Sequence, residues 1–237
     1  MKKILIAGDS FGFGQGCSDR LFYIDPETKK QIGNQNLVYQ GPSKFCWSSL
    51  LQEDYPNYKV INLSYPGSDN MSIASAIYKN LSEDVELIIF AGAAADRIQI
   101  SNPKYPDVPV SWLVGSVPSI DEYPTDWVKA TEYYTKYLYN QDAVTSITVN
   151  AVTSIYGLSA LNTCKFLYSV QPVIKPEKID KWLSKLDKYK MIDMYNFIYG
   201  KSTGLPDYIA EDGHANDLGH LQYYKQIIKP ALERIEL

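Results

Sequence analysis

Two short segments near opposite ends of the chain contain the residue types needed for nucleophilic catalysis. The heptapeptide GDSFGFG at residues 8–14 places a serine in a glycine-rich turn, directly after an apolar run. The decapeptide EDGHANDLGH at residues 211–220 contains both histidines of the protein and three acidic residues. A serine hydroxyl is a weak nucleophile near neutral pH and needs an adjacent base that a carboxylate orients. Together the two segments supply the parts of a serine–histidine–acid site.

Within these segments we expect Ser10 to be the nucleophile and His214 its base. His214 lies in a turn, from which its ring can project toward a sheet edge, whereas His220 lies at the start of a predicted helix. A histidine at that position more often has a packing or capping role. The spacing of six residues and the lack of a third ligand nearby argue against a metal site. We also expect no cofactor, because GxGxxG is absent and no Walker lysine follows the glycine-rich turn. A flavodoxin-like nucleotide-binding protein is therefore the least favoured interpretation.

The elements that must position these residues form an alternating pattern of strands and helices. Short apolar runs predict strands at Ile4–Ala7, Lys59–Leu63, Glu86–Ala91 and Lys165–Val170, with a fifth near Lys190–Met194. Such alternation indicates a parallel sheet with helices on both faces. In open α/β sheets, reactive groups lie at the carboxyl ends of the strands, which is where Ser10 would be.

Apolar residues at helical spacing predict the helices. One helix covers about 71–81, with N-cap candidates at 68–70, and a longer one runs from about Trp127 to Leu161 with a break near 140–142. A shorter helix includes Ile179 to Leu186. The last begins near Leu218, and Pro230 should kink it because proline removes a backbone donor.

Two segments lack a regular pattern and are expected to be loop insertions in one domain that spans residues 1–237. They cover about 17–43 and 97–126. Five prolines in the second segment exclude a regular helix or a central strand there. Long loops of this kind in a compact domain often serve as functional lids or rims.

Composition excludes some classes of partner. The net charge of −4 and the scattered lysines argue against nucleic acid as the main partner. No apolar stretch approaches the roughly 20 residues that cross a bilayer, so we expect no membrane partner and no membrane span. The apolar run after the first lysines is too short for a signal peptide, and three widely spaced cysteines suit a reducing compartment. We expect synthesis in the cytoplasm, with later release by lysis or assembly into a virion left open.

The motifs resemble those of the GDSL/SGNH hydrolases. GDSFGFG resembles the first conserved block of that family, NLSYPGSDN at residues 62–70 is similar to the second, and DGHANDLGH at 212–220 is similar to the last. The blocks occur in the family's order, on the expected elements, and span essentially the whole chain. The resemblance implies a flavodoxin-like, three-layer α/β/α fold with about five parallel strands.

The resemblance also implies residue roles. Ser10 would be the nucleophile and His214 the general base, and the backbone N–H groups of Ser10 and Gly67 would form the oxyanion hole. The orienting acid of the family stands three residues before the histidine, or two in some branches. We favour Asp212, two before, because a short acid in a glycine turn is easier to fix, and Glu211, three before, stays the alternative.

The third block departs from the family pattern. The family has Gly-x-Asn-Asp after the third strand, and the Asn side chain is the third oxyanion donor. This chain has GAAADR at residues 92–97, with Ala94 at the Asn position. Asn70 and Arg97 are the candidate replacements for that donor. Divergent members, including some that look phage-encoded, also lack this Asn and keep an Arg nearby.

Two hypotheses from different classes follow. In the first, the protein is an ester hydrolase (esterase or acetylesterase) that acts on a small acyl ester or an acetylated carbohydrate. In the second, it is an inactive or weakly active binding or structural protein on the same scaffold, such as one associated with a phage. Loss of the Asn donor and the 20 tyrosines favour the second hypothesis. Retention of Ser10, His214 and two nearby acids favours the first.

Overall fold

The computed structural model of the protein describes residues 1–24, 31–33, 40–101, 109–113, 129–130, 132–171, 176–200 and 206–237. Its centre is a four-stranded parallel sheet with the strand order β4-β1-β5-β8. These strands are β1 (Lys2–Gly8), β4 (Tyr58–Asn62), β5 (Val85–Gly92) and β8 (Lys165–Val170). Four of the five predicted strands are thus confirmed, and most of their ends differ by one residue from the predicted bounds.

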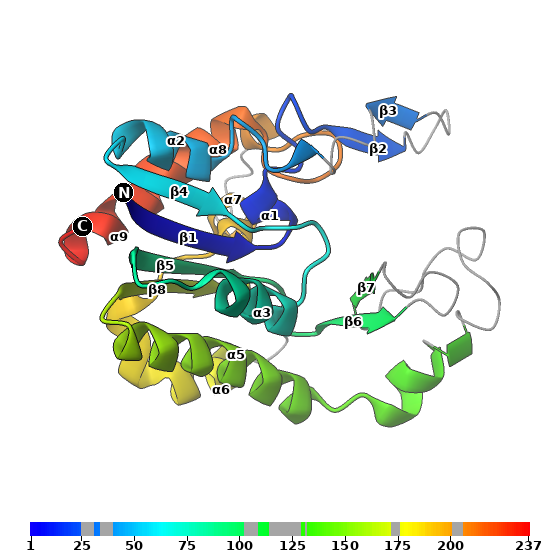
Figure 1. The fold of residues 1–237 in the computed structure, drawn as a ribbon. Helices are drawn as coiled ribbons and strands as arrows, with labels where there is room; N and C mark the ends of the chain where they lie inside the picture. Colours follow the sequence, from blue (N-terminus) through cyan, green and yellow to red (C-terminus); the bar gives the residue numbers. More distant parts are fainter. Residues whose placement is uncertain are drawn as a thin grey trace.

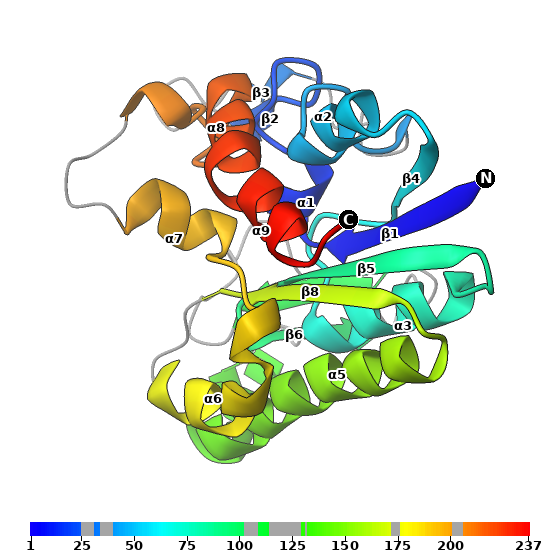
Figure 2. The same ribbon diagram turned by 90° about the vertical axis from the view of Figure 1, so that its left-hand side faces the viewer.

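Helices cover both faces of the sheet and make three layers (Figures 1 and 2). On one face lie α3 (Asn70–Asn80), α5 (Gln141–Leu161) and α6 (Pro176–Leu183). On the other lie α2 (Trp47–Asp54), α7 (Met194–Tyr199), α8 (Asp217–Tyr223) and α9 (Lys229–Arg234). This is the expected α/β/α architecture, and the strand order follows the flavodoxin-like pattern.

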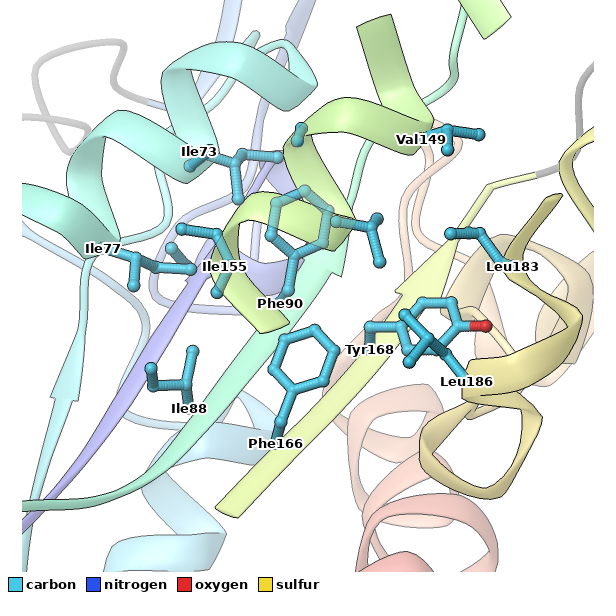
Figure 3. Packing of buried hydrophobic residues seen from close by; sticks show 14 of the residues in the cluster. Ile73, Ile77, Ile88, Phe90, Val149, Ile155, Phe166, Tyr168, Leu183 and Leu186 are labelled. Carbon is cyan, nitrogen blue, oxygen red and sulfur yellow. The ribbon is translucent and has the colours of Figure 1, made fainter. Parts of the chain in front are cut away.

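Alternating side chains of the central strands fill two hydrophobic cores. Ile88 and Phe90 of β5 face the helices α3, α5 and α6, as Figure 3 shows, whereas Leu87 and Ile89 face the opposite helices. These four side chains are fully buried. Strands covered on both faces are apolar throughout, which explains why the sequence shows continuous apolar runs and not alternation.

A fifth strand is expected near 190–194, but the described residues contain only an isolated parallel bridge there, between Tyr168 and Lys190. The Met191 N–H donates to the Tyr168 carbonyl at 2.7 Å. Directly afterwards Asp193 caps α7, because its carboxylate accepts the Asn196 N–H at 2.9 Å. The start of a helix so close to the bridge ends the ladder, and the sheet has four strands instead of about five.

The expected breaks within the helices occur where the sequence places them. Asn140 separates a π-helical turn, η2 (Tyr134–Leu138), from α5 and caps α5 by accepting two backbone N–H groups. The start predicted at Trp127 lies outside the described residues. At the other end of the chain, a π-helical segment η5 (Tyr224–Ile228) separates α8 from α9, and Pro230 lies in the first turn of α9, where proline is tolerated. α6 continues into a 3₁₀ helix, η3 (Ser184–Tyr189), and a further 3₁₀ turn, η4, covers Pro206–Tyr208.

The two irregular segments contain short strand pairs outside the central sheet. In the first, β2 (Phe22–Ile24) pairs antiparallel with β3 (Gln31–Gly33). In the second, β6 (Arg97–Ser101) pairs antiparallel with β7 (Pro109–Leu113). The proline that opens β7 occupies the first position of its strand, where it is tolerated. The remaining residues of the two predicted insertions, 25–30, 34–39, 102–108 and 114–126, lie outside the described ranges.

α5 has the length and composition of a membrane-spanning helix, with a mean hydropathy of 1.3. Ser, Thr and Asn interrupt this helix, so the search of the sequence for apolar runs did not single it out. Within the protein, α5 packs against α3, β5 and β8, and residues such as Val152 and Ile155 are fully buried. These contacts are those of an interior helix of the fold.

Candidate active site

Ser10 stands at the carboxyl end of β1, where a tight turn begins the short helix α1 (Ser10–Phe13). The carboxylate of Asp9 caps this helix by accepting the Phe11 N–H at 3.0 Å. Gly8 and Gly12 allow neighbouring segments to approach closely: a Cβ on Gly8 would lie 2.9 Å from the Ala91 carbonyl. A Cβ on Gly12 would lie 2.5 Å from the Ser64 hydroxyl oxygen, so both positions require glycine for steric reasons.

The loop before α8 brings His214 onto this turn. Its Nε2 lies 3.0 Å from the Ser10 Oγ, within hydrogen-bond distance, across 204 residues of sequence. Gly213 has a φ of 80°, which favours glycine, and its carbonyl accepts a hydrogen bond from the Tyr199 hydroxyl. On the other side, the ring of Phe11 lies 5.1 Å from the imidazole, centroid to centroid. The imidazole is thus held by contacts from α1, and the loop that carries it is held by a contact from α7.

Asp212 contacts His214 at two points. One carboxylate oxygen accepts the His214 backbone N–H at 3.0 Å, and the other lies 3.4 Å from the ring Nδ1. The second distance exceeds that of a formed hydrogen bond, and neither atom has another partner among the described residues. Catalytic contacts are often loose without substrate and tighten when it binds. Burial raises the pKa of Asp212, but the nearby His214 ring and the hydrogen bond from the His214 backbone N–H lower it by more, so the pKa lies below the usual range.

The spacing of two residues explains why Asp212 occupies this position. An aspartate commonly bonds the backbone two residues further on, and this turn aims the carboxylate at the ring that follows. Glu211, in contrast, is exposed, and none of the described contacts joins its carboxylate to His214.

His220 has the packing role expected of it. It is fully buried, and its Nδ1 accepts the Trp47 N–H at 3.3 Å. Burial lowers the pKa of His220 to about 3, so the ring is neutral at physiological pH. Among the described residues no group of three or more His, Cys, Asp and Glu side chains could hold a metal ion.

The side chain of Asn70, one of the two predicted replacement oxyanion donors, bonds to neighbouring elements of the fold. Its side-chain nitrogen donates to the Ala93 carbonyl at 3.1 Å and to the Thr148 hydroxyl at 3.0 Å, and its oxygen accepts the Ala93 N–H at 2.9 Å. Both amide N–H groups are therefore used to join α3 to the end of β5 and to α5. Sequence position alone could not reveal these competing acceptors, and the role of Asn70 as an oxyanion donor stays a prediction.

The other predicted residues of the oxyanion region lie around the end of β1. Gly67, with a φ of 81°, is in the loop after β4, and the same loop bonds to β1 through the Tyr65 N–H and the Gly8 carbonyl at 3.1 Å. Ala94 is half-buried just beyond β5. Arg97 turns back from β6, and its guanidinium lies 3.1 Å from the carboxylate of Asp9.

Two features of the site were missed at the sequence level. Gln171, directly after β8, donates from its amide to the Asp9 carboxylate at 2.8 Å. Its place after a predicted strand was the only available signal. The second feature is a pair of exposed tyrosines on α7, Tyr195 and Tyr199, whose rings lie 4.7 Å apart beside the His214 loop.

No protein-family model and no curated protein sequence matches this chain. Solved structures do resemble it. TesA has a TM-score of 0.53 and 11% identity, with 98% of each chain covered. A protein from Desulfitobacterium hafniense, described as a lipolytic protein of the G-D-S-L family, has a TM-score of 0.52 and 12% identity, with 95% of this chain and 97% of that chain covered.

The chain has the fold of the GDSL/SGNH hydrolases. A carbohydrate esterase whose active site is described as having divergent catalytic and non-catalytic binding functions also shares it, with a TM-score of 0.53 and 12% identity over 99% of this chain and 68% of that chain. At such identities the likeness establishes the fold, and the chemistry has to be argued from the residues of this chain.

Proposed function

We propose that the protein is a serine-dependent ester hydrolase of the SGNH type, with Ser10 as nucleophile, His214 as general base and Asp212 as the acid that orients the base. The observation that carries this proposal is the 3.0 Å contact between the Ser10 Oγ and the His214 Nε2, with Asp212 on the far side of the ring. A nucleophile next to a base, and a base next to an orienting group, is the arrangement that activates a hydroxyl.

In this proposal Ser10 attacks the ester carbonyl while His214 takes its proton. His214 then gives the proton to the leaving alcohol, and an acyl-serine remains. Water, activated by the same imidazole, hydrolyses the acyl-serine and regenerates the hydroxyl. The backbone N–H groups of Ser10 and Gly67 would stabilise the oxyanion. Ala94 supplies no third donor, so we expect slow turnover.

For the substrate we propose a small acyl ester on a carbohydrate, such as an acetylated sugar. Tyr195 and Tyr199 are 41% and 40% exposed, and Tyr195 packs edge-on against Phe11, which contacts the His214 ring. Exposed, well-held aromatic rings beside a reactive serine suit stacking of a sugar ring. A neighbour in fold is itself described as a carbohydrate esterase. A Tyr195→Ala variant should raise KM for an acetylated oligosaccharide and leave p-nitrophenyl acetate hydrolysis nearly unchanged, whereas Tyr78→Ala, exposed on α3, should change neither.

Labelling with a fluorophosphonate probe tests the proposed chemistry without knowledge of the substrate. Wild-type protein should be labelled and should hydrolyse p-nitrophenyl acetate, and Ser10→Ala should do neither while its melting temperature stays nearly the same. Within the described part of the chain, the hydroxyl of Ser10 bonds only to His214, so its removal breaks no bond between core elements. Equal hydrolysis by wild type and Ser10→Ala would assign the activity to another source.

A binding or structural protein on the same scaffold is the second candidate, and the alanine at position 94 is the observation that favours it. Wild-type protein that resists the fluorophosphonate probe and is inert toward a broad ester panel would establish this candidate.

We also propose that the chain forms one domain, since the two hydrophobic cores lie on opposite faces of one sheet. A single cooperative unfolding transition is the expected result.

A further inference from the structure

The carboxylate of Asp9, directly before Ser10, is almost fully buried and accepts hydrogen bonds from three separate segments. It is 1% exposed. One oxygen accepts the Phe11 N–H at 3.0 Å, and the other accepts from the Arg97 guanidinium at 3.1 Å and the Gln171 amide at 2.8 Å. β1, β6 and the end of β8 thus meet at this one side chain. The proposed mechanism assigns no chemical step to the side chains of Asp9, Arg97 and Gln171.

Burial and the groups around Asp9 have opposing effects on its pKa. Burial raises the pKa of Asp9 above the usual range, and Arg97 is the strongest of the influences that lower it, ahead of the bonds from Phe11 and Gln171. The charged and titratable groups that face Asp9 are Arg97 from β6, His214 from its loop and Asp193 from the cap of α7. Asp193 is a second buried carboxylate, whose repulsion opposes ionisation. An ionised group in such a position depends on its positive partner.

The protonation state of Asp9 bears directly on the nucleophile. Asp9 caps the short helix that begins at Ser10, and its carbonyl accepts the Phe13 N–H at 2.9 Å. A charged carboxylate accepts hydrogen bonds more strongly than a neutral acid. If Asp9 becomes protonated, the cap and the Arg97 contact both weaken, and the Ser10 Oγ loses its fixed position relative to His214. A displacement on the order of 1 Å can lower turnover about 100-fold.

We infer that Arg97 and Gln171 are positioning residues that keep Asp9 ionised, and that ionised Asp9 holds the Ser10 turn and so regulates the site by pH. The inference rests on the proposed function for its activity readout only. Because burial moves the titration of Asp9 upward, its protonation begins at a higher pH than for an exposed aspartate. Removal of Arg97 moves it further upward, since the largest opposing influence is lost.

The activity test compares Arg97→Met, Arg97→Lys and wild type over a range of pH with p-nitrophenyl acetate. We expect Arg97→Met to lose on the order of tenfold in kcat near neutral pH, with the loss growing in acid and recovering toward alkaline pH as Asp9 ionises. Arg97→Lys, which keeps the positive charge, should restore most of the activity. Gln171→Met should give a smaller shift in the same direction. Arg234→Met is the matched control, since Arg234 bonds to the Lys190 carbonyl at 2.9 Å and does not contact Asp9.

A second measurement reports Asp9 without any activity. Protein labelled with ¹³C at the aspartate side-chain carboxyls is titrated by NMR, and the Asp9 signal is assigned by its loss in Asp9→Asn. The Asp9 titration should move to higher pH in Arg97→Met and stay in place in Arg234→Met. If the Asp9 titration shifts in this way in a protein that hydrolyses no ester, the proposed function is refuted. The inference that Arg97 keeps Asp9 ionised is then still supported.

Two results would overturn the inference. One is an Asp9 signal that titrates identically in wild type and in well-folded Arg97→Met and Gln171→Met. The other is a loss of kcat in Arg97→Met that is equal at every pH, which would mean that Arg97 acts on the substrate directly.

Discussion

Substitution of Ala94 by asparagine tests whether the missing donor limits the proposed chemistry. The tetrahedral intermediate would meet two backbone N–H groups here, from Ser10 and Gly67, where the family supplies a third from an Asn side chain. One donor of this kind contributes roughly 2.7–4 kcal/mol in a preorganised site. The backbone that would carry it is well held on both sides, because Ala93 is bonded to Asn70 and the Arg97 N–H donates to the Ala94 carbonyl at 3.0 Å.

A grafted side chain will realise only part of that free energy. Its backbone is fixed, but no neighbouring group was selected to hold its rotamer, and small misplacements are costly. If about half of the lower value is recovered, the barrier falls by about 1.4 kcal/mol, which is about tenfold in kcat. Since the contact would form mainly in the transition state, KM should change little.

The assay is steady-state hydrolysis of p-nitrophenyl acetate by wild type, Ala94→Asn and Ala94→Leu. Leucine has nearly the size of asparagine and no donor, so it separates hydrogen bonding from a change in shape. The reasoning requires a gain for Ala94→Asn and none for Ala94→Leu. Flat turnover in well-folded Ala94→Asn, or an equal gain in Ala94→Leu, would refute it.

Three further predictions concern the histidines and their acids. His214→Gln should abolish hydrolysis, whereas His220→Gln should retain most of the activity per folded molecule. Because the buried Trp47 N–H loses its acceptor, His220→Gln should lose about 1–3 kcal/mol of stability in chemical denaturation. Loss of activity in His220→Gln and not in His214→Gln would identify His220 as the base. Asp212→Asn should lower kcat on the order of 1,000-fold or more and Glu211→Gln should have little effect, so a larger loss in the Glu211 variant would show that Glu211 orients the base. Because the pKa of Asp212 is lowered on folding, its ionised form stabilises the fold above the usual aspartate range, and this contribution is lost as the pH falls through the lowered pKa. The difference in unfolding free energy between wild type and Asp212→Asn should therefore be larger near pH 6 than near pH 3, and a constant difference would contradict the assigned contacts.

Local patterns predicted most of the scaffold. The strands β1, β5 and β8 are largely buried apolar runs, because helices cover both faces of the sheet there. The edge strand β4 is only partly buried and still has the apolar residues Val60 and Ile61. The prediction of a fifth strand near 190–194 was wrong for a local reason, because Asp193 caps α7 three residues after the bridge at Lys190. A helix cap and the end of a short strand compete for the same few residues, and pattern alone does not decide between them.

For the candidate active site, too, the sequence determined some features and the tertiary structure determined others. The sequence by itself determined which groups are present: Ser10 in a glycine turn after a strand, and a histidine with an aspartate two residues before it near the last helix. It also determined that Ala94 cannot donate a side-chain hydrogen bond. These are statements about residue type and local geometry, which do not depend on the rest of the fold.

Only the tertiary structure decided how those groups are paired. It placed the His214 Nε2 3.0 Å from the Ser10 Oγ, put Asp212 against the ring in place of Glu211, and used both N–H groups of Asn70 elsewhere. It also joined Asp9 to Arg97 and Gln171, which are 88 and 162 residues away along the chain. The physical reason is that a parallel sheet brings the carboxyl ends of distant strands to one edge, and the partner of a polar side chain there is chosen by distance in space.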